Sequence, residues 1–275
     1  MPESRPPSPQ ALQSAMLEAA GACSKILMRH FGRILEVSEK KDAGLVTKVD
    51  LASEKAAMKV LRKARPDFDF LTEETNPEEK KSQAGQGARG RWIIDPLDGT
   101  TNYIHGFPMF CISLAAEWEG RIVTGVIHAP ALGDTYTAIA GKGARVNGKR
   151  LRVSRTRKLR DSLLTTGFTY RKHTFLHREM EAFERLSGIA RAIRRPGSAA
   201  LDLAYVARGV FDGFWERRLS PWDVAAGMLL VNEAGGKVTD FQGLPFDVRS
   251  PEILASNSLL HDELRQSVAP ECCPI

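Results

Sequence analysis

Apolar and polar positions alternate with two different periods along this chain of 275 residues. Apolar residues at helical spacing predict helices at about 8–30, 50–65, 174–187, 198–208, 222–234 and 258–268. Shorter apolar runs bounded by turn residues predict strands at about 34–38, 68–71, 92–94, 110–118, 121–128, 133–139, 162–167, 190–194, 210–216, 236–240 and 252–256. Because strands alternate with helices after residue 150, the pattern predicts a layered α/β fold.

The chain shows no internal repeat and no linker long enough to separate independent domains. We therefore expect two packed halves, 10–150 and 151–275, preceded by a disordered lead at 1–9. Residues 39–44 and 75–90 are polar and are predicted to be loops.

Composition restricts the class of protein. No apolar run approaches the roughly 20 residues that a bilayer span needs, and the proline-rich start is not a secretory signal, so we expect no membrane segment. The use of the four cysteines fits a reducing cytoplasm best. Cys23 and Cys111 lie in apolar patterns and are predicted to be buried thiols, whereas Cys272 and Cys273 are predicted to be exposed. The spacing of the four cysteines suggests neither zinc nor a disulfide framework.

The net charge of +6 hides an asymmetry, because residues 142–195 hold 16 Lys and Arg against 4 Asp and Glu, a net charge of +12. Such a block can contact nucleic acid, a partner or an anionic substrate. A solvated face is the favoured interpretation, because the stretch lacks the interleaved aromatic residues of a base-stacking surface.

Residues 92–102, Trp-Ile-Ile-Asp-Pro-Leu-Asp-Gly-Thr-Thr-Asn, carry the strongest chemical signal. A buried strand leads into a turn that presents Asp95, the Leu97 carbonyl and Asp98, which are the oxygen ligands that Mg²⁺ prefers. Gly99 lets the backbone approach an anion at the start of a helix. The alternative is an Asp-Pro-x-Asp-Gly turn that caps a helix and binds no metal.

Other acidic residues have weaker signals. Glu73 and Glu74 follow a strand, where neighbouring side chains point to opposite faces, so at most one can face a shared site. Asp223 precedes a helical run and has a plain alternative as an N-cap.

Three blocks together resemble the inositol monophosphatase family: Leu71–Glu74, Trp92–Asn102 and Trp222–Gly227. They occur in that family's order and spacing, and the resemblance extends over roughly residues 10–268. It implies an α-β-α-β-α sugar-phosphatase fold and a lithium-sensitive, Mg²⁺-dependent phosphomonoesterase that uses two or three ions.

The resemblance also implies a set of metal ligands. Glu73, Asp95 and the Leu97 carbonyl would hold one ion, and Asp95, Asp98 and Asp223 a second. Glu73 would help a third ion through water.

Further roles follow from matching positions. Asp50 matches the acid that pairs with the Thr100 hydroxyl, and Glu74 matches an acid behind the metal ligands. Asp98, Gly99, Thr100, Gly197, Ser198 and Ala199 match the substrate-binding positions, and Glu216 matches, by spacing, the acid that binds a polyol hydroxyl. Catalysis would be direct hydrolysis, in which Glu73 and Thr100 position an attacking water that Mg²⁺ activates.

The implied activity is inositol-1-monophosphatase. Alternative substrates within the resemblance are fructose 1,6-bisphosphate, adenosine 3′,5′-bisphosphate, histidinol phosphate and NADP, because a metal motif reads the phosphate and not the leaving group. A different class of function, association with RNA or RNA polymerase, is suggested by the basic block. The family resemblance implies a homodimer.

Overall fold

The computed structural model describes residues 7–33, 37–40, 44–75, 89–168 and 174–269. The helices are α1 Pro9–His30, α2 Lys48–Ala64, α3 Thr100–Ile104, α4 Thr174–Ser187, α5 Ala199–Ala207, α6 Pro221–Glu233 and α7 His261–Val268. The strands are β1 Val37–Lys40, β2 Gly44–Thr47, β3 Asp69–Thr72, β4 Gly90–Asp98, β5 Cys111–Trp118, β6 Arg121–Ala129, β7 Asp134–Ile139, β8 Gly143–Val146, β9 Lys149–Arg150, β10 Leu163–Thr166, β11 Ala192–Arg194, β12 Gly213–Arg217, β13 Lys237–Thr239 and β14 Glu252–Ser256.

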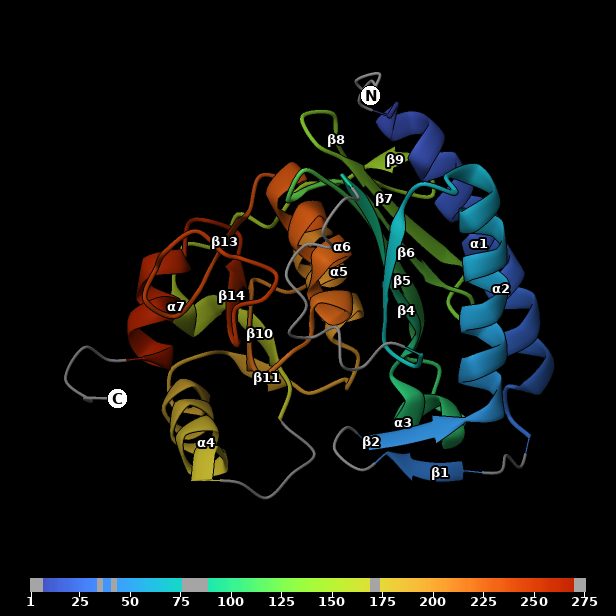
Figure 1. The fold of residues 1–275 in the computed structure, drawn as a ribbon. Coiled ribbons are helices and arrows are strands. Elements are labelled where there is room, and N and C mark those ends of the chain that lie inside the picture. The colour runs from blue at the N-terminus through green and yellow to red at the C-terminus, as the bar shows by residue number, and fades with distance from the viewer. Residues whose placement is uncertain (1–6, 34–36, 41–43, 76–88, 169–173, 270–275) are drawn as a thin grey trace.

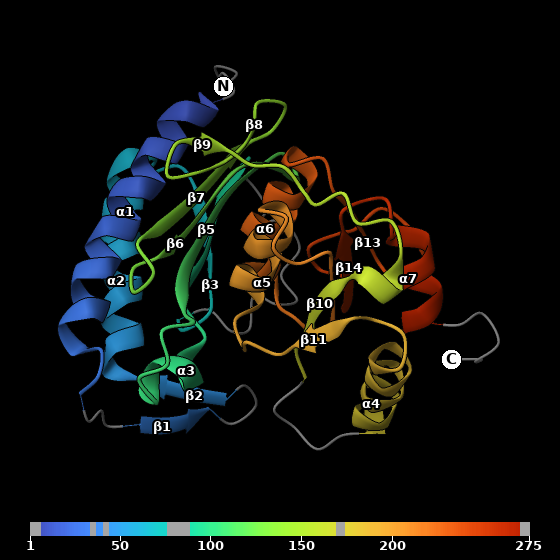
Figure 2. The ribbon, with the colours of Figure 1, turned by 180° about the vertical axis from the view of Figure 1, so that it is seen from behind.

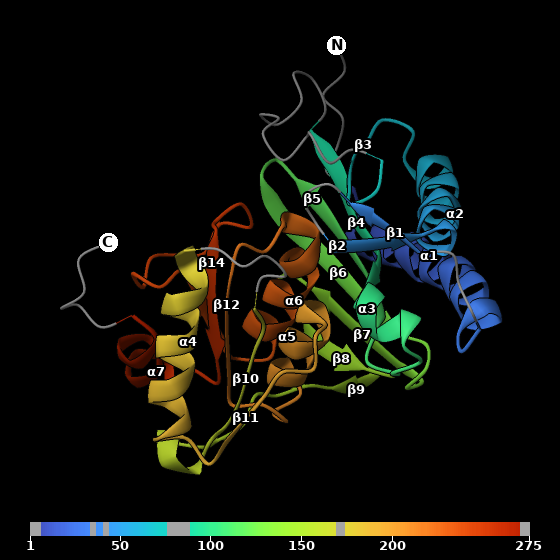
Figure 3. The ribbon, with the colours of Figure 1, turned by 90° about the horizontal axis from the view of Figure 1, so that it is seen from below.

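The five-layer fold predicted from the sequence is confirmed. Helices α1 and α2 cover the outer face of a seven-stranded sheet, and α5 and α6 lie between that sheet and a five-stranded one (Figure 1). Helices α4 and α7 cover the far face of the smaller sheet, as the view from behind also shows (Figure 2). The order of layers is therefore α-β-α-β-α, which the view from below also shows (Figure 3).

The two sheets use different chain orders. The larger sheet runs β3-β4-β5-β6-β7-β8-β9, and its β3–β4 pair is parallel while the other pairs are antiparallel. The smaller sheet runs β11-β10-β12-β14-β13, with β10 parallel to both of its neighbours. The larger sheet ends at Arg150 and the smaller begins at Leu163, which agrees with a division near residue 150; the division into two domains stays a prediction.

Most predicted elements agree with the structure to within a few residues. The predicted loop at 39–44 is wrong at both ends, because β1 continues through Lys40 and β2 begins at Gly44, and the two strands pair with each other. The predicted strand at 210–216 begins only at Gly213, because the backbone N–H groups of Val210 and Phe211 still bond back to Tyr205 at the end of α5. Residues 1–6 of the lead, most of the 75–90 loop, and Cys272 and Cys273 lie outside the described residues.

Helix α6 is buried on nearly all sides, because it packs against both sheets and α5. Its small residues permit this. A Cβ added to Gly125 of β6 would lie 3.0 Å from the Cα of Ala226, and one added to Gly227 would lie 2.6 Å from the Leu203 side chain. The helix that carries Asp223 therefore rests on the larger sheet by direct backbone contact.

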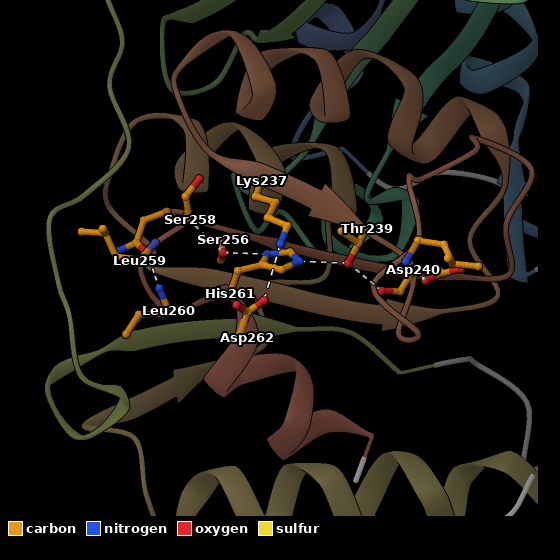
Figure 4. Close-up of polar contacts among 11 residues, drawn as sticks. Lys237, Thr239, Asp240, Ser256, Ser258, Leu259, Leu260, His261 and Asp262 are labelled. Carbon is orange, nitrogen blue, oxygen red and sulfur yellow. Dashed lines mark hydrogen bonds and ion pairs between the residues drawn. The ribbon is translucent and has the colours of Figure 1, made fainter. Parts of the chain in front are cut away.

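A buried histidine joins α7 to the smaller sheet (Figure 4). His261 is 1% exposed; its Nδ1 lies 2.9 Å from the Ser256 hydroxyl and its Nε2 lies 2.9 Å from the Thr239 hydroxyl. The Thr239 hydroxyl donates to the Asp240 carbonyl at 2.6 Å, so Nε2 donates to Thr239 and Nδ1 accepts from Ser256, and a neutral imidazole satisfies both contacts.

Within the described residues, no helix is both long enough and apolar enough to cross a membrane. Cys23 and Cys111 are buried free thiols, as the sequence predicted.

Candidate functional site

A bulge at the end of β4 shapes the central motif. Asp95 pairs with Ser113 and Asp98 with Cys111, so three steps along β4 oppose two along β5. Residues three apart in a regular strand face opposite sides, and one extra residue restores the same side. Pro96 lies within the bulge, where no ladder hydrogen bond is required of it.

Asp95 is 2% exposed and lies among other acids. Burial raises the pKa of its carboxyl well above the ordinary value, and the charges of Glu73, Asp98 and Asp223 raise it further. Four of the residues predicted to hold metal thus lie near enough for their charges to interact.

Asp98 connects β4 to the segment before α5. Its Oδ2 accepts hydrogen bonds from the Ser198 hydroxyl at 2.6 Å and the Ala200 N–H at 2.8 Å. Burial raises the pKa of Asp98 to about 6, although these two bonds act in the opposite direction. The predicted substrate segment Gly197–Ala199 therefore lies beside the metal motif, and Gly197 turns the chain with a φ of +86°.

The Thr100 hydroxyl lies 3.2 Å from Asp50 Oδ1 and 3.1 Å from the Leu97 carbonyl oxygen. One hydroxyl proton can serve one of these acceptors at a time. Asp50 is held in the first turn of α2 by a capping box in which its Oδ2 accepts the Thr47 N–H at 2.9 Å. Burial raises the pKa of Asp50, with a contribution from the charge of Glu73.

Glu73 and Glu74 begin the turn after β3. The Glu73 N–H bonds to the Ile94 carbonyl at 3.3 Å, and the Glu74 N–H bonds to Glu54 Oε2 at 2.8 Å. Glu54 is fully buried in α2, and its Oε1 has no hydrogen-bond partner among the described residues. Glu54 was not among the residues predicted from the sequence, although it lies four residues after Asp50 on the buried face of α2.

Asp223 lies in the first turn of α6, but the predicted alternative role as N-cap is wrong. The N-cap is Ser220, whose N–H donates to Asp223 Oδ2 at 2.6 Å within a capping box. A hydrogen bond joins α6 to β5 at the neighbouring residue, because the Ser113 hydroxyl donates to the Trp222 carbonyl at 3.0 Å. Asp223 is therefore placed by its own helix start and by the larger sheet.

Glu216 of β12 belongs to the same group of acids as Asp95, Asp98 and Asp223. Burial raises the pKa of its carboxyl well above the ordinary value, and the charges of Asp223 and Asp98 raise the pKa further, so Glu216 lies near both residues. A Cβ on Gly167 would come within 2.2 Å of a Glu216 carboxylate oxygen, so the glycine makes room for this side chain. Asp202 of α5 lies nearby, because the charge of Glu216 contributes, after burial, to raising its pKa. Asp202 was not among the residues predicted from the sequence.

The carboxylate oxygens of these acids suit hard cations, because a cation stabilises buried carboxylates of like charge. A cation held there would in turn suit the negative charge of a phosphate ester. Among the described residues, no three His, Cys, Asp or Glu side chains already stand in positions that could hold a metal ion. The assignment of individual ligands accordingly stays a prediction.

The five layers and the buried acids agree with the class of phosphatase that the sequence resemblance implies. The model of the Inositol monophosphatase family matches residues 8–272, and the chain belongs to that family of metal-dependent phosphatases. It is 43% identical over 260 residues to the inositol-1-monophosphatase of Rhizobium meliloti, covering 94% of this chain and 96% of the relative. It is also 41% identical over 269 residues to the Nus factor SuhB of Pseudomonas aeruginosa, covering 96% and 98%.

Solved structures agree with this assignment. The extragenic suppressor protein suhB of Bartonella henselae superposes with a TM-score of 0.87 at 40% identity, covering 95% of this chain and 99% of that one. The fold and the phosphatase class predicted from the sequence are confirmed.

Proposed function

We propose that this enzyme is a Mg²⁺-dependent phosphomonoesterase that acts on inositol 1-phosphate or a similar polyol phosphate. The observation that carries the proposal is the burial of Asp95 among the charges of Glu73, Asp98 and Asp223. An uncompensated group of buried carboxylates is costly, and a divalent cation removes that cost.

Glu73, Asp95, the Leu97 carbonyl, Asp98 and Asp223 would hold two ions, and Glu73 would reach a third through water. All of these donors are oxygens, which suits Mg²⁺. The acidic side chains would rotate to close around the ions on binding, since no three of them stand ready in the described residues. When bound, Mg²⁺ would lower the pKa of a water and offset the charge of the phosphate.

The chain's own residues would orient the reaction. With the Thr100 hydroxyl donating its hydrogen bond to Asp50, the Thr100 oxygen would keep lone pairs for the attacking water, which Glu73 would hold from the other side. Glu74 would support this arrangement through its backbone contact with Glu54.

Different residues would recognise the phosphate and the leaving group. Gly99 and Thr100 would contact the phosphate. The polyol hydroxyls would be contacted by Glu216 and by Gly197, Ser198 and Ala199. The Gly167 position supports the role of Glu216, because it leaves the space that this carboxylate occupies.

Phosphate release from inositol 1-phosphate tests the proposal. We expect activity that needs Mg²⁺ and disappears in EDTA, and we expect Asp95→Asn to lose about 10³-fold in kcat. Asp161→Asn is the matched control, because Asp161 is exposed, and it should leave the rate unchanged. Hydrolysis that persists in EDTA, or that survives intact in Asp95→Asn, would contradict the proposal.

The choice of substrate needs a separate measurement. Values of kcat/KM for inositol 1-phosphate, fructose 1,6-bisphosphate, adenosine 3′,5′-bisphosphate, histidinol phosphate and NADP give the preference directly. We expect inositol 1-phosphate to lead and Glu216→Gln to change the ranking more than it changes the best rate.

Binding to RNA or to the transcription machinery is a second candidate function. It is supported by a relative named Nus factor SuhB and by exposed cations along β8, β9 and the following segment: Arg145, Lys149, Arg150, Arg152, Arg155, Arg157, Lys158 and Arg160. Cations gathered on one stretch suit a phosphate backbone.

Filter binding of RNA at increasing salt, and co-purification with RNA polymerase, test this second function. Reversing the charges of Arg150, Arg152 and Arg155 should weaken binding and flatten its salt dependence. The matched control reverses three exposed lysines of α2, namely Lys55, Lys59 and Lys63. Equal behaviour of the two triple variants would remove the basis for the proposal.

We also propose that the enzyme is a cytoplasmic homodimer and that lithium inhibits its phosphatase activity. Sedimentation equilibrium, cell fractionation and inhibition by LiCl measure these three properties independently.

A further inference from the structure

The Asn102 side chain joins the metal motif to the segment before α5. Its Nδ2 donates to the Met109 carbonyl at 2.7 Å and to the Pro196 carbonyl at 2.8 Å, and the Gly197 carbonyl lies at 3.4 Å. An amide NH₂ has two protons, so the two short bonds use both. One side chain thus binds two loops that are distant in sequence.

Asp98 holds the same segment at its other end. Its carboxylate accepts the Ser198 hydroxyl and the Ala200 N–H. Residues 196–200 are therefore fixed at both ends by two side chains of one short motif, Asp98 and Asn102. We call Asp98, Asn102 and residues 196–200 the clasp.

The clasp has little free space. A Cβ on Gly197 would lie 3.4 Å from Asn102 Nδ2, and Gly197 already has a φ of +86° that side chains disfavour. The turn at Gly197 and the Asn102 amide fit each other closely. A shorter side chain at position 102 would therefore free residues 196 and 197 from the bond that holds them.

We propose that Asn102 is a positioning residue, which holds residues 196–200 at the distance from the metal motif that polyol binding requires. The proposal rests on the function proposed above for Gly197, Ser198 and Ala199. Asn102 acts through that segment, to which its amide is bonded, whereas Asp98 is also held by the pairing of β4 with β5. The loss of Asn102 should therefore weaken substrate binding more than it slows bond breaking.

The test compares Asn102→Ala with wild type in two readouts. We expect KM for inositol 1-phosphate to rise about tenfold, as for a lost buried hydrogen bond or two, while kcat changes less than about threefold. In hydrogen exchange of the metal-free protein, we expect the Ala200 amide to exchange about tenfold faster. Asn102→Ser is likewise too short to reach both carbonyls, so it should behave as the alanine form does, and it provides a second variant if the alanine form does not fold.

Asn257 gives a matched control. Its Nδ2 donates to the Ser154 hydroxyl and the Thr156 carbonyl, both at 2.8 Å. Asn257 directly follows the last residue of β14, whereas Glu216 pairs with Ile253 near the first residue of that strand. Asn257→Ala should lower the melting temperature without changing KM or the exchange of the Ala200 amide.

Three results would overturn the inference: an unchanged KM in Asn102→Ala, an unchanged exchange rate at Ala200, or an equal rise of KM in Asn257→Ala. If wild type hydrolysed no polyol phosphate, the proposed function would fail. The exchange readout would still decide whether Asn102 holds the segment.

Discussion

His261 should make the folded protein sensitive to mild acid. Burial lowers the pKa of its imidazole from 6.5 to about 4, and the neighbouring positive charge of Lys237 adds to this, with Arg265 acting in the same direction and Asp262 opposing both. In the charged form both ring nitrogens would donate, so the Ser256 hydroxyl, which already accepts the Ser258 N–H at 3.2 Å, would have to accept from Nδ1 instead of donating to it. The folded state therefore favours the neutral ring.

The size and sign of the effect follow from the pKa shift. Because the unfolded chain takes up the proton near pH 6.5 and the folded chain only near pH 4, the unfolded state binds more protons between these values. The free energy of unfolding therefore decreases as the pH falls from about 6.5 to about 4. Below about pH 4, His261 causes no further decrease. At 1.36 kcal/mol for each pKa unit, the loss amounts to about 3 kcal/mol.

Urea unfolding of wild type and His261→Gln from about pH 7 to pH 4 measures this contribution. A glutamine can bond to the same hydroxyls but does not titrate in this range. The buried acids of the site are present in both proteins, so their effect cancels in the difference. We expect wild type to be the more stable at pH 7 and to lose about 3 kcal/mol of that advantage by pH 4. A difference that stayed constant over this range would refute the reasoning.

Two further predictions concern packing around charged groups. In Gly167→Ala the new methyl group would displace the Glu216 carboxylate, from which it would lie 2.2 Å, so KM for the polyol phosphate should rise about tenfold in steady-state kinetics. An unchanged KM would show that Glu216 does not meet the substrate. In Glu117→Ala the guanidinium of Arg91, only 9% exposed and 3.2 Å from the Glu117 carboxylate, loses that partner. Chemical denaturation should show a loss of about 3–5 kcal/mol, and a loss below about 1 kcal/mol would contradict a buried ion pair.

The layered fold was predictable because its elements have strong periodicity. Helix α4 begins and ends where the pattern predicts, and strand β14 does too. The order of the smaller sheet was not predictable, because β10 pairs with β11 and β12 across helices and not with a sequence neighbour in a hairpin. Such pairings depend on which apolar faces meet in three dimensions, and local sequence does not state this.

The site was predictable where residues cluster in sequence and unpredictable where they do not. Asp95, Asp98 and Thr100 stand in one short motif, and their proximity to Asp223 and Glu73 agrees with the resemblance. Glu54 and Asp202 were missed, because each is one polar residue within a helical pattern, and only the packing of other elements makes it buried. The bulge in β4 was also missed, since strand register depends on β5.

The contact between Gly125 and Ala226 limits how this enzyme can change. Backbone touches backbone there, so no interchangeable side chain acts as a spacer between β6 and the helix that carries Asp223. A mutation to a bulkier residue at either position would push the whole helix, and its carboxylate would travel with it. Directed evolution of new substrate preferences should therefore leave Gly125 and Ala226 unchanged and vary Glu216 and residues 196–200 instead, which lie outside this contact.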